Sequence, residues 1–198
     1  MITDKDIGVS REVVNRLIRE GSIIEADQKF VEFFLKKAET SLQTAQIILK
    51  ISNNAKIKTE LQLQATYDGY MWIINTAYYS MFYAVTSLLA KYNHRIKVEQ
   101  GLHALTYHAL VYYFLDLDKK LAKHIIEQYQ QAELEASELL QTAEQKAREH
   151  IEKVKFELSK RREFTYEMGK IAEKSKAETS IKRAEEFLTL VKEMIFNK

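Results

Sequence analysis

The sequence predicts an all-α protein, an antiparallel four- or five-helix bundle with one long helix and a short N-terminal helix. Three observations support this prediction. The 198-residue chain contains no proline and only five glycines, so residues that interrupt helices are rare. Apolar residues recur every three to four positions through most of the chain. No segment gives a competing strand signal, so we expect no sheet.

The most informative segment is residues 69–90, which contain no charged residue. A helix without charges must be buried almost all round. Its length would suit a bilayer, but the tyrosines at its centre and its polar residues favour the central helix of a bundle. Small residues at Ala77, Ser80 and Ala84 should let neighbouring helices approach closely. The polar residues are Asn75, Thr76, Ser80, Thr86 and Ser87.

Two helices are expected before this segment. Residues 10–20 form a short helix, with Ser10 as its N-cap and Gly21 as its C-terminal stop. Residues 28–51 form a second helix, which Asp27 can cap. The predicted core stripe of this second helix is Phe30, Phe34, Ala38, Leu42, Ala45 and Leu49. We therefore assign residues 1–26 to an N-terminal helical extension and residues 27–198 to the bundle.

Three helices are expected after it. The first covers about residues 99–115, and the longest begins at Asp116–Asp118 and occupies most of residues 118–160. This long helix either projects beyond the bundle or breaks near residues 137–142, where polarity rises. A last amphipathic helix covers residues 177–196.

Composition excludes several kinds of chemistry. The chain has no cysteine, which excludes thiolate metal sites, disulfides and cysteine nucleophiles. His103, His108 and Asp116 lack the spacing of a metal site, so we expect no metal and no cofactor. The net charge of +2 does not by itself demand a nucleic-acid partner. The N-terminal residues do not resemble a signal peptide, so we expect a cytoplasmic protein without a membrane partner.

Three segments resemble the HEPN family of small helical-bundle proteins. Residues 77–84, AYYSMFYA, with Leu88 and Leu89 behind them, resemble the second core helix of that family. His103 resembles the histidine that begins the third helix, and residues 161–166, RREFTY, resemble the arginine-containing segment before the final helix. The resemblance covers about residues 28–196.

This resemblance implies an RNA- or nucleotide-associated protein, as part of a toxin–antitoxin system or beside a partner nucleotidyltransferase. The ribonucleases of the family use an arginine, four to six residues, and then a histidine, which stabilise phosphate charge and move a proton. Here Arg95 and His103 have seven residues between them, and no histidine follows Arg161 or Arg162. We therefore keep two alternatives open: a non-catalytic protein-interaction module, and a divergent metal-independent ribonuclease.

The predicted binding residues follow from the resemblance and from local charge. Arg161, Arg162 and Tyr166 are the first candidates for contact with a nucleotide or RNA, since an arginine beside an aromatic hydroxyl can hold a phosphate. Their alternative role is structural hydrogen bonding. Arg95 and His103 are weaker candidates, and the sequence favours His103 as a partly buried residue at a helix start. Aromatic residues around Tyr78–Tyr83 and Tyr107–Tyr113 are mostly expected in the core, and one face of them predicts a homodimer interface.

Overall fold

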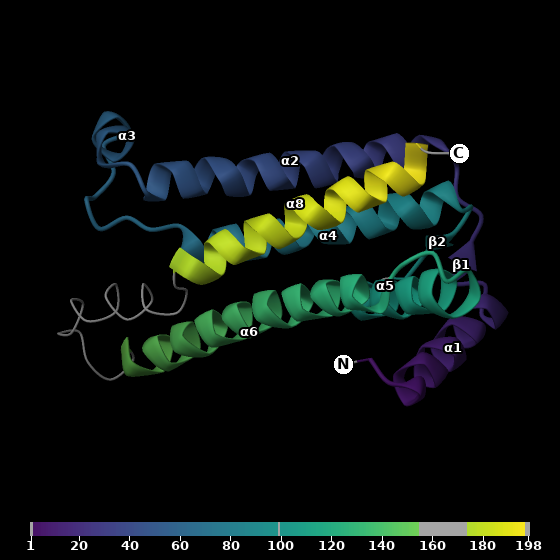
Figure 1. The fold of residues 1–198 in the computed structure, drawn as a ribbon. Helices are drawn as coiled ribbons and strands as arrows, with labels where there is room; N and C mark the ends of the chain where they lie inside the picture. The colour runs from purple at the N-terminus through teal and green to yellow at the C-terminus, as the bar shows by residue number, and fades with distance from the viewer. Residues whose placement is uncertain (1, 99, 155–173, 197–198) are drawn as a thin grey trace.

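The computed structural model describes residues 2–98, 100–154 and 174–196, and most of them are helical, which confirms the predicted all-α class (Figure 1). The main helices lie side by side along one direction (Figure 1). The elements in chain order are α1 (Asp4–Arg19), β1 (Ile23–Ile24), α2 (Lys29–Ser52), α3 (Ala55–Glu60), α4 (Tyr70–Lys91), β2 (Arg95–Ile96), α5 (Leu102–Leu110), η1 (Val111–Leu117), α6 (Lys123–Val154) and α8 (Lys174–Phe196).

The uncharged helix α4 lies at the centre, as predicted. It packs most extensively against α2, then against α8, α6 and α5 (Figure 1). Residues on several of its faces are almost fully buried, including Ile73, Met81 and Leu88. One face remains partly open, because Trp72 is 56% exposed and Thr76, Tyr79, Tyr83 and Thr86 are only half-buried.

Small residues bring α2 and α4 together. Ala38 and Ala45 of α2 are fully buried against α4. Buried Ser80 donates a hydrogen bond to the Ala38 carbonyl over 2.8 Å, and Ser87 donates one to the Val31 carbonyl over 2.7 Å. Each hydroxyl is therefore satisfied by a backbone oxygen of the neighbouring helix, which lets two polar residues occupy the core.

The N-terminal helix begins earlier than predicted. Thr3 is its N-cap, in a reciprocal capping box with Asp6, so the predicted cap at Ser10 is wrong. Ser10 instead lies buried inside α1, where its hydroxyl hydrogen-bonds to His108 Nδ1 over 3.0 Å. Gly21 has a φ of 66° just after the helix, which agrees with its predicted role as the stop.

A short β-ribbon contradicts the expectation of no strand. Ile23 pairs with Ile96 and Ile24 pairs with Arg95, antiparallel, in two strands of two residues each. The turn after α4 creates this pairing. Asn93 adopts a left-handed φ of 64°, and its side chain accepts a hydrogen bond from the Ala26 amide over 3.2 Å. The ribbon thus ties the α1–α2 connection to the end of α4.

The segment between α5 and α6 also differs from the prediction. Helix α5 ends at Leu110 and continues as the π-helical turn η1, and α6 begins only at Lys123. Lys119, with a φ of 50°, breaks the helical path between them. From Lys123 the helix is continuous to Val154, so there is no break near residues 137–142.

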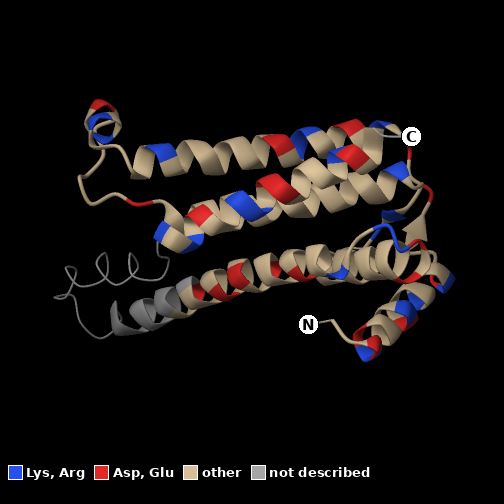
Figure 2. Cartoon of the chain, in the orientation of Figure 1, with Lys and Arg blue, Asp and Glu red and all other residues tan. Residues whose placement is uncertain are grey.

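Helix α8 follows its predicted stripe closely. The buried positions Ile181, Ala184, Leu188, Val191 and Ile195 face the core. Its outer face carries charges of both signs (Figure 2). Arg183 pairs with Glu135 of α6 over 2.9 Å and Lys192 pairs with Glu39 of α2, so α8 is linked to helices on both sides.

We predict opposite effects of alanine at two glycines. A Cβ at buried Gly69 would overlap the Cγ2 atom of Ile48, and the Gly69 amide is held by Ser52 Oγ over 3.0 Å. Gly69→Ala should therefore lower the free energy of unfolding by about 1–3 kcal/mol. Gly8 lies in α1 with open space around it, so Gly8→Ala should raise that free energy by about 1 kcal/mol.

Urea unfolding followed by circular dichroism measures both changes. A Gly69→Ala protein as stable as the original would contradict the close approach of α2 and α4 at this point.

Candidate functional site

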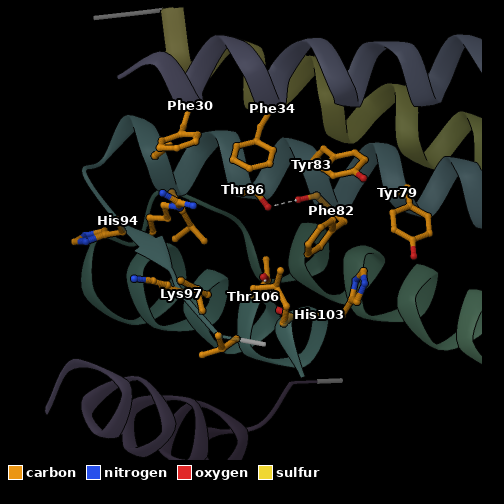
Figure 3. Close-up of a pocket in the computed structure, with 16 residues that line it drawn as sticks. Phe30, Phe34, Tyr79, Phe82, Tyr83, Thr86, His94, Lys97, His103 and Thr106 are labelled. Carbon is orange, nitrogen blue, oxygen red and sulfur yellow. Dashed lines mark hydrogen bonds between the residues drawn. The ribbon is translucent and has the colours of Figure 1, made fainter. Parts of the chain in front are cut away.

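A cavity of about 610 Å³ lies between α2, α4, the β2 segment and the start of α5 (Figure 3). It opens on the half-buried face of α4. Its size is in the range of about 300–1,000 Å³ typical of small-molecule sites. The residues from α2 and α4 that line it are Phe30, Phe34, Tyr79, Phe82, Tyr83, Thr86, Leu89 and Ala90. The residues that follow α4 are His94, Arg95, Ile96, Lys97, Val98, Leu102, His103 and Thr106.

Aromatic rings from two helices form one wall. Phe30 and Phe34 are one turn apart on α2, and Tyr79 and Tyr83 are one turn apart on α4. The Phe34 and Tyr83 rings lie nearly parallel, at 18° with centroids 6.2 Å apart. The two helices thus present flat apolar faces to the cavity.

The β-ribbon supplies the positive charge. Pairing of β2 with β1 fixes Arg95, and the Lys97 amide donates to the Ser22 carbonyl over 2.8 Å. The Arg95 guanidinium lies over the Phe30 ring, 4.2 Å from its centroid. Lys97 is exposed. Among the described residues that line the cavity, none is acidic, so the site favours an anionic or electron-rich ligand.

His94 and Lys97 lie at one end of the cavity, and Tyr79 and His103 lie at the other (Figure 3). The His103 ring packs against Phe82 with centroids 4.3 Å apart, and its Nδ1 atom is 2.7 Å from the Tyr78 hydroxyl. Burial lowers the pKa of His103 below its usual value. The imidazole is therefore neutral at neutral pH.

Behind His103, buried polar side chains from α4, α5 and α6 meet. Burial raises the pKa of the Glu133 carboxyl, and burial with nearby acids raises the pKa of Tyr107 to about 12. Tyr129 is fully buried, and its pKa is raised by burial and by nearby Tyr78 and Glu133. With pKa values raised in this way, the hydroxyls of these tyrosines stay protonated at neutral pH.

The structure places two of the predicted residues together. Arg95 and His103 line the same cavity, although the seven residues between them do not match the spacing of the ribonuclease motif. Arg161, Arg162 and Tyr166 lie outside the described residues, so their predicted role stays a prediction.

Sequence periodicity does not identify Phe30 and Phe34 as cavity residues, because it places them in the core stripe of α2. The buried residues of α2 include Val31 and Leu35 instead.

No protein-family model, no curated protein and no solved structure matches this chain. The HEPN resemblance therefore rests on the residues quoted above.

The described part of the chain holds no group of three or more His, Asp or Glu side chains placed to bind a metal ion. None of the described helices combines the length and apolarity needed to cross a bilayer.

We predict that stability falls on mild acidification. Burial lowers the pKa of His94, His103 and His108 below 6.5 in the folded state. The unfolded chain then binds more protons than the folded one, so the free energy of unfolding falls as the pH drops through about 6.5. The urea midpoint should be lower at pH 5.5 than at pH 7.5.

A variant that lacks one of these groups tests the cause. His103→Gln should show a smaller drop between the two pH values, whereas His124→Gln, at an exposed position, should match the original protein. Asp6, Asp27 and Asp116, whose pKa values are lowered by hydrogen bonds, stabilise the fold above about pH 4 and do not affect this range. A midpoint that rises on acidification would contradict this account.

Proposed function

We propose that the cavity binds a nucleotide, either free or as one unit of a single-stranded RNA. The observation that carries this proposal is the pairing of aromatic walls with Arg95 and Lys97 in one cavity whose described lining has no acidic residue. The HEPN resemblance, with its link to RNA and nucleotides, supports the same class of ligand.

Each part of a nucleotide has a suitable counterpart. A base can stack on the rings of Phe34, Tyr79 or Tyr83, an interaction worth about 1–3 kcal/mol per base. A phosphate can accept hydrogen bonds from Arg95, whose planar guanidinium suits two oxygens at once, and from Lys97. The cavity volume of about 610 Å³ is sufficient for one such unit.

We propose that the cavity binds the nucleotide without cleaving it. Arg95 and His103 lack the spacing of the family's ribonuclease motif, and an arginine near a phosphate leaves proton transfer unassisted, which forfeits about 10²–10⁴-fold in rate. A partner nucleotidyltransferase or a toxin–antitoxin pairing is proposed from the family resemblance alone.

We predict that Arg95→Ala/Lys97→Ala weakens nucleotide binding at least tenfold. Loss of charge-assisted hydrogen bonds worth about 1.5–3 kcal/mol each is the physical reason, reduced here by the exposure of Lys97. The probes are the four ribonucleoside 5′-monophosphates in calorimetry and a fluorescein-labelled octaribonucleotide in anisotropy. Affinity for the octamer should fall as salt is added.

The matched control is Lys50→Ala/Lys176→Ala, which removes the same charge from exposed positions outside the cavity lining. Equal weakening by both double variants would mean that only general charge matters. Failure of every probe to bind the unmodified protein would overturn the proposed function. Binding of the octamer without any mononucleotide would identify RNA as the ligand.

We also propose a homodimer. Phe33 of α2 and Trp72 of α4 are more than half exposed, at 52% and 56%, and each offers an aromatic ring to a second copy. Light scattering at micromolar concentration should give about twice the 23.2 kDa chain mass. A monomer under these conditions would contradict it.

A further inference from the structure

A hydrogen bond between Tyr78 and His103 joins α4 to α5 across 25 residues of sequence, with Tyr78 Oη and His103 Nδ1 2.7 Å apart. Tyr78 is only 5% exposed, whereas His103 lines the cavity. The ring nitrogen that Tyr78 does not engage is therefore the one available to a ligand.

The direction of this hydrogen bond decides which nitrogen carries the proton. Either Tyr78 donates to Nδ1, which leaves the imidazole proton on Nε2, or Nδ1 carries the proton and donates to Tyr78. A buried hydroxyl hydrogen without an acceptor is costly, by about 1–3 kcal/mol. The second arrangement leaves the Tyr78 hydrogen to find another acceptor in the core.

The neighbouring Tyr129 favours the first arrangement. Its fully buried hydroxyl makes no hydrogen bond of standard geometry within the described residues, yet it lies close enough to Tyr78 for each to influence the ionisation of the other. The Tyr129 hydrogen is best directed at the Tyr78 oxygen, since that oxygen accepts while its own hydrogen points to His103. Burial raises the pKa of Tyr78, so this hydroxyl remains protonated and able to donate.

We infer that Tyr78 is a positioning residue that holds the His103 proton on Nε2, so that His103 meets the ligand as a hydrogen-bond donor and not as a base. This inference rests on the proposed function for the identity of the ligand. The bond and the tautomer themselves are properties of the protein without ligand.

The role of a donor follows from where His103 lies. It is at the end of the cavity opposite Lys97 and His94 (Figure 3), so a phosphate held by the cationic end places the base near His103. An Nε2–H group then pairs with an atom that only accepts, such as a ring carbonyl oxygen or a pyridine-like ring nitrogen. With its proton already on Nε2, His103 cannot accept a proton from a ligand at this atom.

The test is ¹⁵N NMR of histidine-labelled protein without ligand. His103 should show a protonated Nε2 and a hydrogen-bonded acceptor Nδ1. In Tyr78→Phe, which keeps the ring and removes the hydroxyl, the Nδ1 signal should move to that of a free acceptor. Tyr112→Phe, a matched loss of a hydroxyl outside the cavity lining, should leave the His103 signals unchanged.

Affinity for uridine 5′-monophosphate provides the second measurement. Tyr78→Phe should weaken it about threefold and His103→Ala about tenfold, the span expected for one neutral hydrogen bond, while Tyr112→Phe has no effect. A proton on Nδ1 in the unmodified protein, or identical spectra and affinities in Tyr78→Phe and Tyr112→Phe, would overturn the inference. If no nucleotide binds the unmodified protein, the proposed function fails, and the NMR spectra still decide the role of Tyr78.

Discussion

The burial of one uncharged helix determines the rest of this structure. Residues 69–90 carry no charge, so α4 is stable in water only when other helices cover it. Helices α2, α8 and α6 pack on three of its sides. Ser80 and Ser87 fix the contact with α2, because each hydroxyl donates to a backbone carbonyl of that helix. These neighbouring helices leave one face of α4 incompletely covered, and the cavity lies on that face.

The cavity depends on this incomplete cover and on the short β-ribbon. The open face of α4 contributes Tyr79, Tyr83 and Thr86, which are spaced one turn apart. The ribbon then holds Arg95 and Lys97 beside the cavity. Without the β1–β2 pairing, these two residues would lie in an unpaired loop after α4. Apolar rings and cations thus come from different parts of the chain, and the combination suits a ligand that is flat at one end and anionic at the other.

Sequence periodicity was enough to predict the helices with a single apolar stripe. Helix α8 buries its predicted residues, and α4 was recognised from its lack of charge. Helix α2 has two apolar faces, and periodicity alone predicts a core position for Phe30 and Phe34, although these rings line the cavity.

Other features depend on contacts between distant residues. Two-residue strands have no periodicity to read, and the ribbon depends on the left-handed conformation of Asn93. The contact of Tyr78 with His103 joins two helices and could not be inferred from spacing. Arg95 and His103 were identified as separate candidates, and only the fold shows that they share a cavity.

Nucleotide binding in the aromatic and cationic cavity on the open face of α4 can be observed by an NMR titration of the full chain with uridine 5′-monophosphate, followed at aromatic and threonine methyl groups. We expect saturable shifts at Phe34, Tyr79, Tyr83, Thr86 and Thr106, with none at Trp72, which lies outside the cavity lining. Shifts centred on Trp72, or no saturable shift at the cavity residues, would contradict binding in this cavity.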